Sequence, residues 1–84
     1  MGEQLVGKVN EYFAKIGVAG IQLTDELVVG DTIRIHGHTT DFTQQVASIQ
    51  IEKQVVPKAT AGQSIGIKVK EKVREHDRVF KVTP

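Results

Sequence analysis

Two histidine-bearing stretches hold the residue types that could do chemistry. His36 and His38 stand two positions apart, so on a strand they would share a face, as two ligands of one metal ion do. His76 precedes Asp77, which is the pairing of a general base with an orienting carboxylate. Neither set is complete, because no third metal ligand stands nearby and the chain has no cysteine and no serine in a nucleophile-type turn. We therefore expect no metal, no cofactor and no catalytic residue, and a protein that is not an enzyme.

A second candidate is a run of basic residues near the C-terminal end. Four cations between positions 68 and 74 alternate with other residues, so a continued extended backbone would project them on one side. Such a row binds nucleic-acid phosphates without reading sequence, and a nearby aromatic ring can stack on a base. The alternative is that strand lysines protect an edge from pairing and keep the domain in solution. The predicted RNA-binding residues are Lys8, Tyr12, Arg34, Lys68, Lys70, Lys72 and Arg74.

The charge distribution agrees with either interpretation. Residues 1–42 carry three basic and six acidic side chains, a net charge of −3, whereas residues 43–84 carry eight basic and four acidic ones, a net charge of +4. An uneven distribution of this kind can mark a basic surface for nucleic acid, and it can also be an ordinary solvated surface.

Length and composition indicate one small domain over residues 1–84. Aromatic residues are few, and the many valines and isoleucines favour strands. No apolar run approaches the ~20 residues that span a bilayer, and the N-terminus lacks the zones of a signal peptide. We expect a cytoplasmic monomer that does not bind a membrane.

Alternation of apolar and polar residues places the strands. Glycines at 7 and 17 and β-branched valines favour a first strand, although a helix over 3–16 also fits the spacing. In this strand we expect Val9 and Phe13 inside, with Lys8 and Tyr12 outside. The predicted strands are 4–14, 18–23, 27–37, 42–56, 65–69 and 78–82.

Turns and irregularities complete the expected architecture. Glycine-bearing corners at Gly30, Gly62 and Gly66 and a β-bulge near Ser48 would let the strands coil, and Leu27 would pack under one end. The segment 71–77 is charged and is predicted to be an exposed turn. The fold class that follows is all-β: a small closed six-stranded antiparallel barrel of Greek-key type, whose closure removes exposed edges.

Several segments resemble the second-domain β-barrel of translational GTPases, the domain found in elongation factor Tu and initiation factor two. The strongest is Leu27-x-Val29-Gly30-Asp31-x-Ile33-x-Ile35-x-Gly37. The same barrel is also appended to other enzymes, including collagenase-like peptidases. The remaining matching segments, in the family's order, are Gly7-Lys8-Val9, Val46-Ala47-Ser48-Ile49, Ala59–Ile67 and His76-Asp77-Arg78-Val79.

The resemblance implies a function without catalysis. The chain has no Gly-x-x-x-x-Gly-Lys-Ser/Thr loop, so it lacks the phosphate cradle of a GTPase and is expected to bind no nucleotide. A translation-factor-like barrel would bind ribosomal or transfer RNA through its basic face. The alternative is a protein-interaction adaptor that docks on a GTPase or on an enzyme lacking its own barrel.

Overall fold

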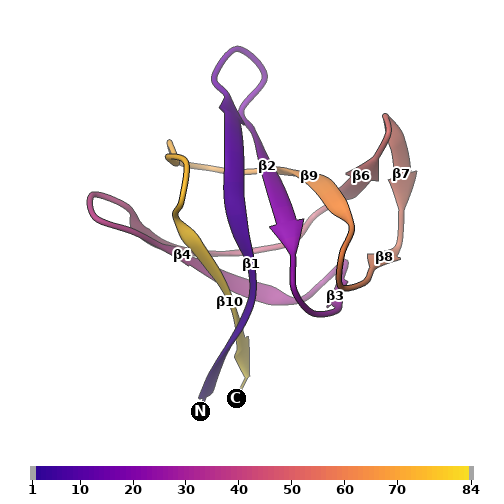
Figure 1. The fold of residues 1–84 in the computed structure, drawn as a ribbon, viewed down its shortest axis with the longest axis horizontal. Helices are drawn as coiled ribbons and strands as arrows, with labels where there is room; N and C mark the ends of the chain where they lie inside the picture. Colours follow the sequence, from indigo (N-terminus) through magenta and orange to yellow (C-terminus); the bar gives the residue numbers. More distant parts are fainter. Residues whose placement is uncertain (1, 84) are drawn as a thin grey trace.

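A computed structural model describes residues 2–83 as an all-β fold (Figure 1). The N-terminal stretch forms a strand rather than the alternative helix over 3–16. Its β-branched residues and its pairing on both sides explain this choice, because a helix would leave the neighbouring strands without a partner. The strands are β1 Gly2–Phe13, β2 Val18–Leu23, β3 Leu27–Val28, β4 Thr32–His36, β5 Asp41–Gln45, β6 Ile49–Ile51, β7 Gln54–Val56, β8 Lys58–Ala59, β9 Ser64–Lys68 and β10 Arg78–Thr83.

Eight of these strands form one antiparallel sheet in the order β5-β4-β10-β1-β2-β9-β6-β7. The sheet curls strongly, and β3 and β8 form a second, two-stranded sheet beside it (Figure 1). The end strands β5 and β7 are not hydrogen-bonded to each other as a ladder, so the predicted closed six-stranded barrel is not found. The all-β, antiparallel part of the prediction is confirmed.

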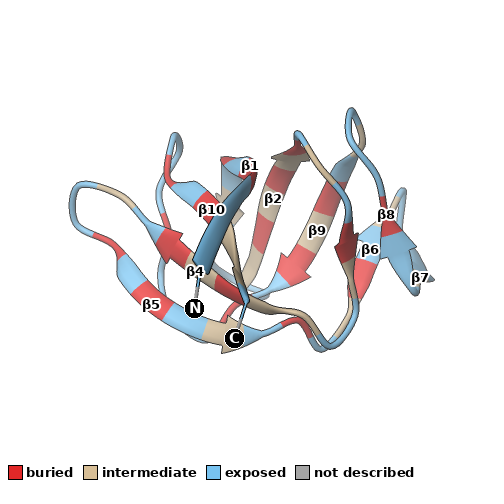
Figure 2. Cartoon of the chain, turned by 90° about the horizontal axis from the view of Figure 1, so that it is seen from below, coloured by how far each residue is buried: buried red, intermediate tan, exposed pale blue. Residues whose placement is uncertain are grey.

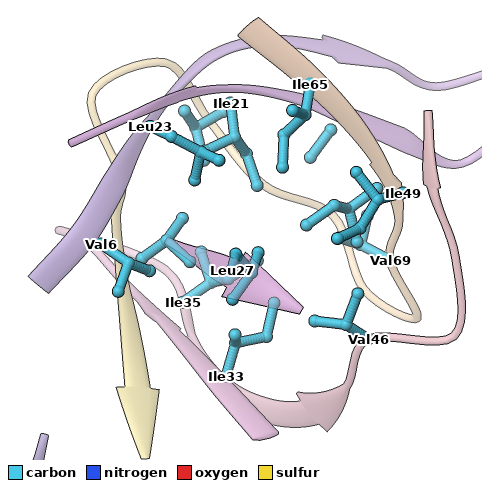
Figure 3. Close-up of a cluster of buried hydrophobic side chains, with 14 of the residues drawn as sticks. Val6, Ile21, Leu23, Leu27, Ile33, Ile35, Val46, Ile49, Ile65 and Val69 are labelled. Carbon is cyan, nitrogen blue, oxygen red and sulfur yellow. The ribbon is translucent and has the colours of Figure 1, made fainter. Parts of the chain in front are cut away.

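The inner face of the curled sheet carries the core. In β2, β4 and β9 every second residue is buried, as the alternation predicts, and Figure 2 shows the resulting stripes. Leu27, which was expected to pack under one end of the barrel, is fully buried among the side chains from the large sheet (Figure 3). The largest fully buried side chains are Ile21, Leu23, Leu27, Ile33, Ile35, Ile49 and Ile67.

Strand β1 departs from simple alternation at two places. Its register shifts between Leu5 and Gly7 against β10, and again between Val9 and Glu11 against β2. Each shift inserts one residue and reverses which face the following side chains take. Val9 is buried as predicted, but Phe13 is 45 % exposed and Tyr12 packs against the core, so their predicted sides are wrong.

The predicted long strand 42–56 is three short strands. β5 ends at Gln45, and the chain is irregular at 46–48, where a bulge near Ser48 was expected. β6 and β7 then form a tight hairpin whose two turn residues, Glu52 and Lys53, have φ of 49° and 68°. These left-handed conformations are uncommon for side-chain-bearing residues and are the geometry of a two-residue hairpin turn.

The charged segment 71–77 is not simply exposed. Val73 and Asp77 are buried, at 2 % and 4 % exposure. Two backbone hydrogen bonds fix the segment to β1, because Val9 donates to the Asp77 carbonyl at 2.8 Å and His76 donates to the Val9 carbonyl at 2.9 Å. The Asp77 carboxylate accepts from the Arg74 amide at 2.9 Å, which closes the turn on itself.

A side chain joins two parts of the curled sheet that backbone pairing leaves apart. The Gln44 amide on β5 donates to the Lys68 carbonyl at 2.9 Å and accepts from the Lys70 amide at 2.8 Å. A carboxamide has the same donor and acceptor as a peptide group, so Gln44 takes the place of a missing strand partner. We call this contact the Gln44 bridge.

Replacing Gln44 by leucine should lower the free energy of unfolding by about 1–2 kcal/mol, because two backbone groups lose their partner. Urea unfolding measures this, and amide exchange at Lys70 should quicken. Gln45→Leu is the matched control, since Gln45 is exposed on the same strand. Equal stability of the two variants would show that the bridge does not hold the sheet together.

Within residues 2–83 there is no helix long and apolar enough to cross a membrane.

Candidate binding groove

A hollow with a mainly apolar lining lies between the tips of two hairpins. We call it the hairpin groove; its volume is about 500 Å³. The β1–β2 hairpin forms one side, the β6–β7 hairpin the other, and β9 runs between them (Figure 1). Its lining residues are Asn10, Glu11, Phe13, Ile16, Val18, Gly20, Ile21, Gln50, Glu52, Lys53, Ser64, Ile65 and Gly66.

The floor of the hairpin groove contains two glycines on adjacent strands. Gly20 on β2 pairs with Gly66 on β9, and Gly66 also pairs with Gln50 on β6. A Cβ on Gly66 would come within 3.3 Å of Val18, so the space above this glycine is narrow. Neighbouring side chains therefore border both glycines, with Val18 beside Gly66 and Phe13 beside Gly20.

Apolar side chains wall the groove at the β1–β2 end. Phe13 is 45 % exposed and Ile16 is 62 % exposed, although both are large and hydrophobic. The Phe13 ring covers Gly20, since a Cβ on that glycine would lie 3.7 Å from ring atom Cε2. An exposed aromatic and an exposed aliphatic side chain beside a hollow are what an apolar ligand needs to bind.

The opposite rim is polar and conformationally unusual. Glu52 and Lys53, the two left-handed residues of the β6–β7 turn, both line the groove. Residues held in such conformations gather at ligand-binding sites, where the surrounding structure fixes them. The rim therefore offers one carboxylate, one ammonium group and the exposed Gln50 amide to the polar groups of a ligand.

The predicted RNA-binding residues do not all lie on paired strands. β9 ends at Lys68, although beyond it Val69 and Val73 are buried and Lys70, Lys72 and Arg74 are exposed, as in the predicted alternation. These three cations lie on the connection to β10. Lys8 is exposed on β1, whereas Tyr12 packs against the core and is not a free stacking ring.

Arg34, another of the predicted RNA-binding residues, forms ion pairs with two carboxylates. Its guanidinium donates to Asp41 at 2.8 and 2.9 Å and lies 3.2 Å from Glu3. The hydrogen bond from Arg34 holds the pKa of the Asp41 carboxyl below its usual value, and the two carboxylates raise the pKa of Arg34. This cluster joins β1, β4 and β5 on the outer face.

Replacing Asp41 by asparagine should make the stability of the fold depend less on pH in the acid range. Because the folded pKa of Asp41 is lowered, its ion pair stabilises the fold above the unfolded pKa of about 3.9 and is lost as pH falls through the lower folded value. The effect is small for an exposed pair. Thermal unfolding between pH 6 and pH 2 measures it, and parallel curves for variant and wild type would contradict the assignment.

None of the three histidines lies in a cluster of metal-ligating side chains within the described part of the chain. His36 ends β4 beside Asp41 and Arg78, and His76 lies in the 74–77 turn with a φ of 74°. Among residues 2–83, no three His, Cys, Asp or Glu side chains gather as metal ligands do.

Comparison with known proteins links the chain to peptidases. No protein-family model matches it. It is 47 % identical over 78 residues to a protein named collagenase from Porphyromonas gingivalis, and 41 % identical over 76 residues to an uncharacterized protease of Methanocaldococcus jannaschii. These matches cover 90 % and 89 % of the chain but 22 % and 19 % of the relatives, so the chain spans about a fifth of their length.

Solved structures give the same link. The fold matches the C-terminal domain of a Geobacillus thermoleovorans protein that is named as a candidate U32 peptidase, with a TM-score of 0.89 at 24 % identity over 95 % of this chain and 93 % of that one. The selenomethionine variant of that domain matches with a TM-score of 0.89 at 25 % identity over 93 % of this chain and 99 % of its own length.

These findings correct the functional predictions. The relatives are peptidases rather than translational GTPases, so the resemblance to elongation factor Tu does not identify the chain, and the translation-factor function is wrong. The expectation that the protein is not an enzyme is also contradicted, because its relatives are named as a collagenase and a protease. The adaptor alternative agrees with these findings only in linking the chain to an enzyme.

Sequence reasoning missed the residues of the hairpin groove. Phe13 was placed in the core, and Glu52 and Lys53 were placed within a long strand. The signal that was available is the apolar pair Phe13 and Ile16 flanking a turn with Gly17. Large apolar residues at a hairpin tip have no core to enter, so they mark a contact surface.

Proposed function

We propose that this chain serves as the small β domain of a collagenase-like peptidase and holds extended polypeptide substrate in the hairpin groove. The observation that carries the proposal is the 47 % identity with the collagenase over 90 % of the chain. Because the chain spans about a fifth of that relative, peptide-bond cleavage in this proposal belongs to the whole enzyme, and the domain contributes by binding substrate.

The shape of the hairpin groove supports a polypeptide ligand. The exposed side chains of Phe13 and Ile16 suit apolar side chains or proline rings. The exposed Asn10 and Gln50 carry carboxamides that can bond to peptide groups. Apolar burial of this kind contributes about 1.5–3 kcal/mol for each side chain that becomes fully covered.

Binding to immobilised gelatin tests the proposal. The chain should bind gelatin, and the double variant Phe13→Ser with Ile16→Ser should bind at least tenfold more weakly, since ~1.4 kcal/mol corresponds to tenfold. Val55→Ser is the matched control, because Val55 is 69 % exposed yet lies outside the groove lining. Both wild type and variants should unfold at similar temperatures, because these side chains are on the surface.

Two results would contradict the proposal. The chain could fail to bind gelatin at all, or the double variant could bind as tightly as wild type. Adding the chain to a homologous collagenase that lacks its own small β domain gives a second readout. The proposal expects faster gelatin cleavage with wild type than with the groove variant.

A further inference from the structure

A second hollow lies on the other side of the β1–β2 hairpin and is lined by basic side chains and an exposed leucine. Its volume is about 510 Å³, and its lining residues are Leu5, Gly7, Lys8, Thr24, His76 and Arg78. We call it the Lys8–Arg78 hollow. None of these residues lines the hairpin groove.

The strand register sets three basic side chains side by side. Lys8 on β1 is directly opposite Arg78 on β10, and Arg78 is directly opposite His36 on β4. Neighbouring strands lie about 4.8 Å apart, and directly opposed like charges destabilise a sheet. All three side chains are exposed, so they share the outer face.

Within residues 2–83, neither Lys8 nor Arg78 forms an ion pair, whereas Arg34, Lys58 and Lys81 each do. Two carboxylates are near this row: Glu75 borders an adjoining hollow together with Lys8 and His76, and Asp41, which Arg34 already pairs, is directly opposite His36. Two opposed cations without a paired anion are a ready partner for a carboxylate from outside the chain.

The fold also fixes the backbone of His76 at this hollow. His76 has a φ of 74°, an uncommon conformation for a histidine, and its amide bonds to the Val9 carbonyl. This hydrogen bond places His76 beside the neighbouring Lys8.

We propose that the Lys8–Arg78 hollow binds the C-terminal carboxylate of a peptide whose last residue is apolar. Leu5 is 46 % exposed and supplies the apolar contact, while Lys8 and Arg78 supply charge-assisted hydrogen bonds. A chain terminus carries a carboxylate and an apolar side chain on one carbon, whereas an aspartate or glutamate side chain does not. The inference rests on the proposed function only for the source of the ligand, because a peptidase releases such ends.

Titration of the labelled chain with acetylated tripeptides ending in leucine, followed by nuclear magnetic resonance, tests the proposal. The free acid should shift the Lys8, His76 and Arg78 amides and bind at least tenfold more tightly than the C-terminal amide. Lys8→Gln and Arg78→Gln should each weaken binding of the free-acid peptide about tenfold. Lys70→Gln is the matched control and should leave affinity unchanged, because Lys70 lies outside this hollow.

Three results would overturn it: equal affinity for acid and amide, equal or tighter binding of an amidated oligoglutamate peptide, and tighter binding of an RNA oligonucleotide through the same residues. These outcomes are independent of gelatin binding by the hairpin groove, because the tripeptide is added directly. Failure of one proposal therefore leaves the other standing.

Discussion

Replacing Gly37 by alanine is expected to lower the free energy of unfolding by about 2–4 kcal/mol. A Cβ at this position would lie 1.8 Å from Asp77 Oδ1 and 2.6 Å from its Cγ, far inside contact distance. Asp77 cannot move aside easily. It is 4 % exposed, its other carboxylate oxygen accepts from the Arg74 amide, and its carbonyl accepts from Val9.

A double-variant cycle measured by urea unfolding separates this clash from other causes. Asp77→Ala removes the obstructing carboxylate and should itself destabilise the turn. Gly37→Ala should then cost far less in the Asp77→Ala background than in wild type, with a coupling energy above ~1 kcal/mol. If the two variants were simply additive, the contact between Gly37 and Asp77 would have no role in the stability of the fold.

The position of Asp77 also shows why the 71–77 segment was misjudged. Its composition is charged, and charge normally indicates solvent. Asp77 is nevertheless buried, because its carboxylate caps the backbone of its own turn and its neighbours carry the exposed charge. Local hydrogen bonding of an aspartate is visible in sequence only as a possibility, and tertiary packing against Gly37 decides it.

Strands with regular alternation were predictable, and strands with inserted residues were not. The pattern around Ile33 and Ile35 gives the correct inner face of β4. In β1 the shift between Val9 and Glu11 reverses the sides of Tyr12 and Phe13. The register shifts of β1 are not visible in its composition, so Phe13 of the groove's apolar wall was predicted to be in the core.

The functional misassignment has a related cause. The segment Leu27–Gly37 that resembles translational GTPases consists of a turn at Gly30-Asp31 and buried strand positions such as Ile33 and Ile35. Such positions specify how a small β domain folds, and a fold can serve unrelated functions. The groove residues come from distant parts of the chain, around 13–16, 50–53 and 64–66, so only the structure brings them together.

Replacing Leu27 by alanine is expected to lower the free energy of unfolding by about 3 kcal/mol, within the 2–5 kcal/mol range for buried leucines. Leu27 is fully buried, and β3 pairs with β8 at only two positions, so little backbone pairing can compensate. Its side chain lies among Val6, Ile33 and Ile35 (Figure 3). The free energy of unfolding of a domain of this size is about 5–10 kcal/mol, so the expected loss is a large part of the total.

Urea unfolding of three variants tests whether packing is the cause. Leu27→Met keeps most of the volume and should cost less than ~1.5 kcal/mol, and Val28→Ala on the same strand should cost less than ~1 kcal/mol because Val28 is partly exposed. Similar losses for Leu27→Ala and Val28→Ala would mean that β3 contributes through backbone pairing instead. Leu27 does not line the hairpin groove, so the folded fraction of Leu27→Ala should bind gelatin like wild type, whereas a weakened affinity would show that the core sets the groove's shape.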